Sequence, residues 1–257
     1  PTEGVNRWIF FSGKSLRFSD RGGAIDCCAS NPLERNLNQD STSKSPLLHS
    51  PLAEFHLSRG AKMTPFGGFL MPLNYPAGIL AEHKHCRTKA SLFDVSHMGQ
   101  FTLTSPLGLE HLAAELETLI PGNLIELKQG QLCYTMFTNI RGGIIDDLIV
   151  ARTPTDFLIV GNANNRHKDF EILREGLSQN IAIKQEKRGL IALQGPDSSE
   201  VLMRYSSEPM NLSFLEGVHS TICGQSCWIS RSGYTGEDGY EIAAPPDSIQ
   251  RIAETLF

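Results

Sequence analysis

Hydrophobic and polar positions follow a regular pattern only from about Gly99 onward. Short segments typical of β-strands recur there at 100–104, 132–138, 144–151, 157–161 and 181–185. Between them, helical spacing relates Leu109, Leu112, Leu116 and Leu119, and also Phe170, Leu173 and Leu177. Ser105-Pro106 predicts the start of the first of these helices. This order of elements predicts an antiparallel α+β module of ferredoxin-like type over residues 99–186.

A second pattern surrounds the first one. Before Gly99, helices are predicted at 52–59 and 79–90, a loop-like stretch at 63–75 and an extended piece at 92–95. After it, strands are predicted at 190–193, 227–230 and 240–243, with helices at 198–205 and near the end of the chain. In the final helix, Asp247 is the expected cap, and Ile249, Ile252 and Leu256 share one face. The fold class is therefore α+β, with a module of residues 99–186 inserted into one built from 47–98 and 187–257.

The first 46 residues differ from the rest of the chain. They are rich in Ser, Asn, Arg and Gly and have little periodicity. An organelle transit peptide would avoid acidic residues, yet this stretch contains Glu3, Asp20, Asp26, Glu34 and Asp40. The chain also begins with Pro1. We expect residues 1–46 to be disordered or a non-native leader.

Composition narrows the possible functions. Of the 257 residues, 40% are hydrophobic and 20% are charged. This composition is typical of a globular protein with enough apolar residues to form a buried core. The net charge of -5 gives no electrostatic reason to bind nucleic acid, and no apolar run reaches the ~18 residues of a transmembrane helix. The six cysteines form no C-x-x-C pair, and free thiols fit better than a disulfide framework. Cys223 and Cys227 lack a second pair of ligands, so a metal site is disfavoured.

Two segments carry candidate chemistry. In GGIIDDLIV, Asp146 and Asp147 open a strongly apolar strand, and period-two alternation sends their carboxylates to opposite faces. One can then be solvated while the other enters a cavity, although a turn-facing acidic pair is the plainer interpretation. In RSGYTGEDGYEI, three glycines permit close approach of a ligand. An acidic hairpin tip explains part of that segment, but Glu241 opens an apolar strand and does not fit that explanation.

Other signals are weaker or missing. His97 in LFDVSHMGQ could act as a base or ligand, although a lone histidine is more often a structural hydrogen-bonding group. His83 and His85 lie two apart on a predicted helix and face different directions. The sequence contains no Walker A motif, no G-x-G-x-x-G after a strand, and no motif of a Ser or Cys nucleophile.

Taken together, several segments resemble one family. SLFDVSHMGQ, YTMFTNIRGGIIDDLIV, LIVGNAN, ALQGP and RSGYTGEDGYEI occur here in the order found in the T-proteins (aminomethyltransferases) of the glycine cleavage system. The segment PLAEFHLSRGAKMTPFGGFLMPLNYPAGILAEH is similar to theirs as well. The resemblance covers about residues 46–257. The motif sequences are most similar to those of bacterial members of the family, and mitochondrial members have similar ones.

The resemblance implies a reaction and its participants. Such enzymes move the methylene of an aminomethyl group, carried on the lipoyl arm of H-protein, to the co-substrate tetrahydrofolate and release ammonia, without a metal. The implied partners are lipoylated H-protein and tetrahydrofolate, with neither nucleic acid nor membrane. The implied compartment is the bacterial cytoplasm, with the mitochondrial matrix as the alternative.

The resemblance also assigns roles to residues. Asp147 matches the second Asp of the family's pair and is the expected catalytic residue. Glu241 matches the pterin-binding glutamate, since a carboxylate accepts from adjacent N–H and NH₂ donors. Other matched positions are expected to line the folate site: Met98, Tyr134, Ile149 and Tyr234 as walls, and Asn162 as a polar neighbour.

Alternatives stay open at this point. The family continues beyond the position of Phe257 into an Arg-bearing helix and a C-terminal barrel, so this chain is expected to be an N-terminal fragment, and an inactive one is an alternative. A folate-binding relative in iron–sulfur protein maintenance carries K-G-C-Y-x-G-Q-E where this chain has RSGYTGEDGYE. Folate-linked demethylases of sarcosine or dimethylglycine share the fold but usually follow a flavin domain.

Overall fold

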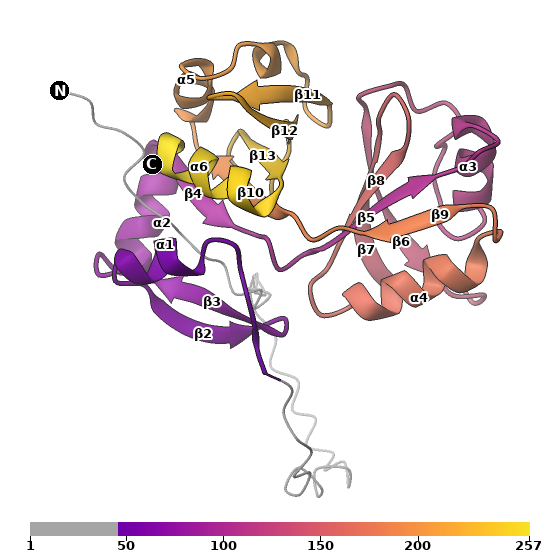
Figure 1. The fold of residues 1–257 in the computed structure, drawn as a ribbon, viewed down its shortest axis with the longest axis horizontal. Helices are drawn as coiled ribbons and strands as arrows, with labels where there is room; N and C mark the ends of the chain where they lie inside the picture. Colours follow the sequence, from indigo (N-terminus) through magenta and orange to yellow (C-terminus); the bar gives the residue numbers. More distant parts are fainter. Residues whose placement is uncertain (1–45) are drawn as a thin grey trace, which may run out of the picture.

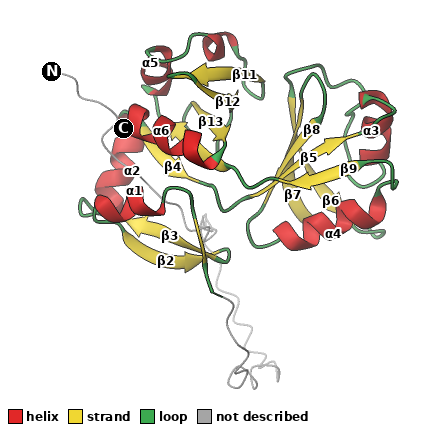
Figure 2. Cartoon of the chain, viewed as in Figure 1, coloured by secondary structure: helices red, strands yellow, loops and turns green. Residues whose placement is uncertain are grey.

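The computed structural model describes residues 46–257, so the expectation for residues 1–46 lies almost wholly outside the described part. Within it, the strands form three separate sheets, and helices lie beside them (Figures 1 and 2). The α+β class and the predominance of antiparallel pairing are confirmed, with one parallel pair, β1 (Leu48–His49) beside β3 (Phe69–Asn74). The division into folding units at the expected boundaries stays a prediction.

One five-stranded sheet has the order β6-β7-β8-β5-β9, with every neighbouring pair antiparallel. Its strands are β5 (Gly99–Thr104), β6 (Leu132–Thr138), β7 (Ile144–Arg152), β8 (Phe157–Gly161) and β9 (Ala182–Gln185). The helices α3 (Leu109–Leu116) and α4 (Arg166–Gly176) connect strands of this sheet. Without the added edge strand β6, the order is that of a ferredoxin-like module, as the sequence predicts.

The helix α3 begins later than expected. Ser105 and Pro106 form a turn in which the Ser105 hydroxyl accepts the backbone N–H of Leu107, and the helix starts at Leu109 after Gly108. Gly108 has a φ of 92°, a left-handed conformation that suits glycine and delays the helix by one turn. The Ser-Pro signal therefore marks the turn before the helix.

Both helices cover one face of this sheet. Leu112 and Leu116 of α3 and Leu173 of α4 pack in one cluster with strand side chains such as Phe101 and Val150. The opposite face carries Leu132, Ile149, Ala151, Leu158 and Val160. That second face is apolar too, and it turns toward the rest of the molecule.

A second sheet has the order β11-β12-β13-β10-β4 and is also antiparallel. Its strands are β4 (Ser91–Asp94), β10 (Gly189–Gln194), β11 (Gly217–Ile222), β12 (Gln225–Ser230) and β13 (Gly239–Ala244). Strand β11 was not expected from the sequence, because its outward residues His219 and Thr221 interrupt the apolar pattern. It pairs along its whole length with β12.

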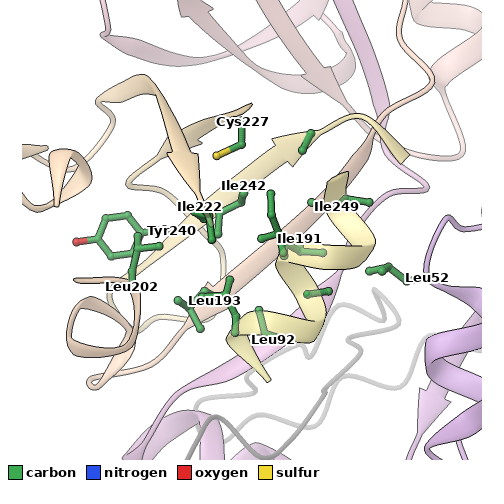
Figure 3. Packing of buried hydrophobic residues seen from close by; sticks show 14 of the residues in the cluster. Leu52, Leu92, Ile191, Leu193, Leu202, Ile222, Cys227, Tyr240, Ile242 and Ile249 are labelled. Atoms are coloured by element: carbon green, nitrogen blue, oxygen red, sulfur yellow. The ribbon is translucent and has the colours of Figure 1, made fainter. Parts of the chain in front are cut away.

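Helices enclose the core of this second sheet. Ile249, Ile252 and Leu256, which were predicted to share one face of α6 (Pro246–Leu256), are all buried among strand residues that include Ile191 and Ile242 (Figure 3). The expected cap is wrong: Pro245 occupies the N-cap position and Asp247 makes no capping hydrogen bond. Pro246 begins the helix because its fixed φ suits the first turn.

The remaining elements lie beside these two sheets. They are α1 (Ala53–Ser58), α2 (Ile79–Thr88), α5 (Ser198–Met203) and a short 3₁₀ helix at Glu208–Asn211. The stretch expected to be loop-like, 63–75, is instead an antiparallel hairpin of β2 (Lys62–Phe66) and β3. Its prolines and its Gly67-Gly68 turn concealed the strands in the sequence. Among residues 46–257, no helix has the length and apolar character needed to cross a bilayer.

A small apolar cluster joins the two large sheets. Leu132, Ile149 and Leu158 from the ferredoxin-like sheet pack with Leu190, Trp228 and Ala243 from the second sheet. The β2–β3 hairpin reaches the same region, where the Arg166 guanidinium of α4 donates a hydrogen bond to the Gly67 carbonyl oxygen. All three sheets therefore meet around one place.

Candidate functional site

A cavity of about 620 Å³ lies where the three sheets meet. Its walls are mostly apolar, with a few polar side chains from different elements, a combination typical of small-molecule sites. The polar residues that line it include Asp146, Asp147, Asn162, Arg188, Gln194 and Glu241. The expected site residues Met98, Ile149 and Tyr234 line it as well.

Asp147 is held by two side chains. Strand β7 places it opposite Met136 of β6, on the same side as Ile149. Its Oδ1 accepts a hydrogen bond of 2.9 Å from the Asn162 side-chain amide, and its Oδ2 accepts one of 2.8 Å from the Tyr134 hydroxyl. Both donors favour a fixed carboxylate at the cavity wall.

Tyr134 itself does not line the cavity. It is 50% exposed on strand β6 and contacts the site through its bond to Asp147. Nearby negative charge raises the pKa of its phenol, chiefly through that hydrogen bond to Asp147. The phenol therefore acts as a donor to Asp147 over the whole neutral pH range.

The expected separation of the two aspartates is only partly right. Alternation along β7 does direct Asp146 toward the helix-covered face, where its neighbours Leu148 and Val150 are buried. Yet Asp146 also lines the cavity, and its Oδ1 accepts a hydrogen bond of 2.9 Å from the same Asn162 amide. Asn162 follows the end of β8, so its side chain reaches both faces and joins the two carboxylates.

Asp146 is therefore linked to the site of Asp147, although the alternation along the strand had placed the two side chains on separate faces. It is only 6% exposed and accepts a second side-chain hydrogen bond of 2.7 Å from Asn165. The backbone N–H of Asn162 donates a longer one of 3.3 Å to its Oδ2. A buried carboxylate requires such donors, because losing hydration without them would be costly.

Glu241 reaches the cavity from the second sheet. It lies on β13 between Ala192 of β10 and Ser230 of β12. Burial raises the pKa of its carboxyl, while a hydrogen bond donated by the Ser232 hydroxyl opposes that rise. An ionised carboxylate has more acceptor sites than the one that the Ser232 hydroxyl fills, and a ligand with adjacent N–H donors could use the others.

Gln194 fixes the loop before Glu241. Its side-chain amide donates to the Ser232 carbonyl oxygen at 2.8 Å, and its Oε1 accepts from the Thr235 hydroxyl at 2.8 Å. Gly233 has a φ of 151°, and a Cβ on it would lie 2.1 Å from Gln194 Oε1. The motif ALQGP therefore supports the motif RSGYTGEDGYEI, and the loop presents Tyr234, 68% exposed, at the cavity.

Several lining residues were not expected from the sequence. Arg188 forms a paired contact with Gln100, donating from Nε to Gln100 Oε1 at 2.9 Å while Gln100 Nε2 donates to the Arg188 carbonyl oxygen. Burial lowers the pKa of the Arg188 guanidinium. Trp228 and Phe66 add aromatic surface. Arg188, Trp228 and Phe66 lie in no motif with recognised chemistry, so only the fold brings them together.

His97, an open candidate from the sequence, lies in the cavity wall. It is buried, and the Phe66 ring packs against it edge to face at 5.2 Å. Burial lowers the pKa of its imidazole to about 4, with nearby Asp94 opposing and Arg166 adding to that effect. The imidazole is therefore neutral at physiological pH.

The weak metal candidates do not come together. Cys223 sits at the β11–β12 turn and is exposed, whereas Cys227 is buried in the core of the second sheet. Within residues 46–257, no group of three or more His, Cys, Asp or Glu side chains is placed to hold a metal ion. The polar groups of the cavity are instead suited to hydrogen bonding.

Comparison with known proteins gives a consistent set of relatives. The chain is 39% identical over 212 residues to the aminomethyltransferase of Halothermothrix orenii, a match covering 81% of this chain and 58% of that protein. It is 35% identical over 227 residues to the mitochondrial aminomethyltransferase of Dictyostelium discoideum, covering 84% and 55%. The chain therefore spans less than two thirds of the length of these curated relatives.

The fold is similar to a solved structure from the same group. The crystal structure of glycine cleavage system aminomethyltransferase T from Bartonella henselae superposes with a TM-score of 0.76 at 39% identity, covering 82% of this chain and 57% of that one. The family model described as the GCVT N-terminal domain matches residues 52–257. Because that match takes in most of the chain, including every strand of the two five-stranded sheets, the chain belongs to the glycine cleavage T-protein family.

Proposed function

We propose that this chain carries the folate site of an aminomethyltransferase of glycine cleavage. The reaction moves a methylene group from aminomethylated, lipoylated H-protein to tetrahydrofolate. The carbon–sulfur and carbon–nitrogen bonds of the aminomethyl group break, and two new bonds join the carbon to folate nitrogens. The two folate N–H protons end on the lipoyl sulfur and on ammonia, so no oxidant or reductant is needed.

The observation that carries the proposal is the pairing of Asp147 and Glu241 in one cavity. They come from different sheets, yet both line the same apolar space of about 620 Å³. A pterin ring is flat and carries adjacent N–H donors at one end, which a carboxylate such as Glu241 can accept together. Its reacting nitrogens would then face the other carboxylate, Asp147.

Each residue has a distinct proposed role. Asp147, fixed by Asn162 and Tyr134, stabilises positive charge that develops as the methylene bridge forms, and it can accept a proton. Glu241 orients the pterin. Met98, Ile149 and Tyr234 form apolar and aromatic walls for the folate, and these contacts exclude water from the reacting atoms.

The partners and compartment follow from the same proposal. Lipoylated H-protein delivers the aminomethyl group, and tetrahydrofolate accepts its carbon. We assign the chain to the bacterial cytoplasm, with the mitochondrial matrix as the alternative, because its relatives include bacterial and mitochondrial proteins. Neither nucleic acid nor membrane has a role in the reaction.

Two tests separate this proposal from its alternatives. Purified chain titrated with tetrahydrofolate in a calorimeter should bind one equivalent, and Glu241→Gln should weaken that binding; an inactive fragment without a folate site would give no heat in either case. Protein expressed from the complete reading frame should then form 5,10-methylenetetrahydrofolate from aminomethylated H-protein. Turnover of sarcosine or dimethylglycine in place of H-protein would assign the chain to the demethylases instead.

A further inference from the structure

Asp169 is a buried carboxyl group without a hydrogen-bond donor. It lies on helix α4, is 0% exposed, and neither of its side-chain oxygens receives a hydrogen bond from a donor group among the described residues. A carboxylate in that position would lose its hydration and gain nothing in return. A carboxylic acid would not, because its own O–H can donate to an acceptor.

The acceptor beside it is Asp146. A Cβ added to Gly161 of β8 would lie 2.8 Å from Asp169 Oδ2 and 3.9 Å from Asp146 Oδ2. Asp169 Oδ2 therefore uses the space that this glycine leaves open, and Asp146 Oδ2 borders the same space. Three donor contacts, two from Asn162 and one from Asn165, already reach Asp146, whereas none reaches Asp169. The proton of the pair is best placed on Asp169.

The surrounding charges act in the same direction. Burial first, then the charge of Asp146 and hydrogen bonding with it, and to a smaller extent the charge of Asp147, together raise the pKa of the Asp169 carboxyl to about 8. Lys168, on the same helix, opposes the rise. Neither β5 nor β8 carries a titratable side chain in its strand, and Lys184 of β9 pairs with Glu186.

We propose that Asp169 is a positioning residue of the site, which keeps its proton and donates a hydrogen bond to Oδ2 of Asp146. This bond fixes Asp146, and Asp146 fixes the Asn162 amide, whose second N–H holds Oδ1 of Asp147. A chain of hydrogen bonds thus runs from helix α4 beneath the sheet to the cavity. Its effect on turnover rests on the proposed function, but the protonated pair itself does not.

The first test measures stability and needs no activity. Because the folded-state pKa is raised, the wild-type chain loses stability as pH rises from about 4, the ordinary value, to about 8. Asp169→Asn keeps a donor for Asp146 and cannot titrate. The ratio of its folding constant to that of the wild type should therefore rise by up to about tenfold per pH unit in this window and level off above it.

Urea unfolding of both chains at several pH values between 5 and 9 gives this ratio, and other titrating groups such as Glu241 cancel in the comparison. Asp247→Asn, an exposed change on α6, is the control and should give a flat ratio. Asp169→Ser, whose hydroxyl also donates without titrating, serves in the same way should the Asn variant not fold. If the ratio of folding constants for a folded Asp169 variant did not change with pH, the proposal that Asp169 keeps its proton would be wrong.

The second test asks whether the pair positions the site. In protein expressed from the complete reading frame, Asp169→Leu fills similar space without a donor and should lower kcat about tenfold or more with little change in KM for tetrahydrofolate. Asp169→Asn should restore most of the kcat. Equal kcat values for the Leu and Asn variants would overturn the positioning role. Should the pH-dependent stability ratio appear while every variant and the wild type lack turnover, the proton pair would stand and the proposed function would fail.

Discussion

The Tyr134 hydroxyl donates a 2.8 Å hydrogen bond to Oδ2 of Asp147, across neighbouring strands of the ferredoxin-like sheet. Together with the Asn162 amide on Oδ1, it leaves the carboxylate one orientation at the cavity wall. Two donors on two oxygens are a means of fixing a charged group before substrate arrives, which is the condition for electrostatic catalysis.

Tyr134→Phe removes one of these donors and keeps the ring. Because Tyr134 is half exposed, water can replace the hydroxyl, so turnover should fall only about two- to tenfold, the value of one ordinary hydrogen bond. Steady-state kinetics with tetrahydrofolate and aminomethylated H-protein measure it, and Tyr205→Phe, on an exposed tyrosine, is the control. A loss as large as that of Asp147→Asn would mean that the hydroxyl itself takes part in the chemistry.

Asp146→Asn should destabilise the fold. The new amide would place N–H groups against donors from Asn162 and Asn165, so the free energy of unfolding should fall by about 1.5–3 kcal/mol, as for a buried hydrogen bond to a charged group. Urea unfolding at pH 7 measures the change. The exposed Asp247→Asn should change it by less than about 0.5 kcal/mol, and similar values for both variants would show that Asp146 is not held as described.

Glu241→Gln should weaken tetrahydrofolate binding more than it weakens the fold. Replacing the carboxylate by an amide leaves one acceptor oxygen and adds a donor facing the pterin donors, which should raise Kd about tenfold to a hundredfold. Calorimetric titration measures this. Glu237 lies in the loop before Glu241, and Glu237→Gln breaks only its partly exposed ion pair with Arg87 of α2, so Kd should stay unchanged. Equal effects of the two variants would remove Glu241 from the binding site.

Asp94 joins β4 to α1 through a fully buried pair with His56, whose Nε2 lies 2.8 Å from Asp94 Oδ2. Burial by itself would raise the pKa of Asp94, but the hydrogen bond and charge of His56, with hydroxyl and backbone donors, lower it overall. Asp94→Asn should therefore cost about 3–5 kcal/mol near neutral pH.

The sign of the pH dependence follows from that lowered pKa. The stabilisation is present above the ordinary pKa of about 4 and is lost as pH falls through the lower folded-state value, so the difference between wild type and Asp94→Asn should shrink in acid. Urea unfolding from pH 7 to pH 3 tests this. Asp197→Asn, in an exposed pair with Lys89, should cost at most about 1 kcal/mol at any pH.

Most strands and helices could be predicted from the sequence because their apolar positions repeat with a clear period. The prediction of a loop at 63–75 was wrong for a local reason, because Pro65 and Pro72 interrupt the strand pattern in the sequence. The hairpin is held by the pairing of its two strands and by packing beside α1. The predicted start of α3 was wrong because Ser105 caps a turn that precedes the helix.

The residues of the candidate site could be predicted from the sequence only in part. The pattern draws attention to the Asp146-Asp147 pair and to Glu241, because a carboxylate in an apolar strand is costly, whereas the choice of Asp147 and the role of Glu241 come from the family resemblance. The connection from Asp146 through Asn162 to Asp147 does not stand out, because alternation describes one strand and Asn162 follows another one. Asp169 looks like an ordinary residue of helix α4 until the fold places it against Asp146.

The most direct test of the account is the turnover of Asp147→Asn in protein expressed from the complete reading frame, at saturating tetrahydrofolate and aminomethylated H-protein. The change keeps the shape and removes the charge. Turnover should fall by about two orders of magnitude or more, as for the loss of one group that stabilises developing charge. Kd for tetrahydrofolate should change much less, because the ground state carries less of that charge. Turnover equal to that of the wild type would contradict the assignment of Asp147 as the catalytic residue.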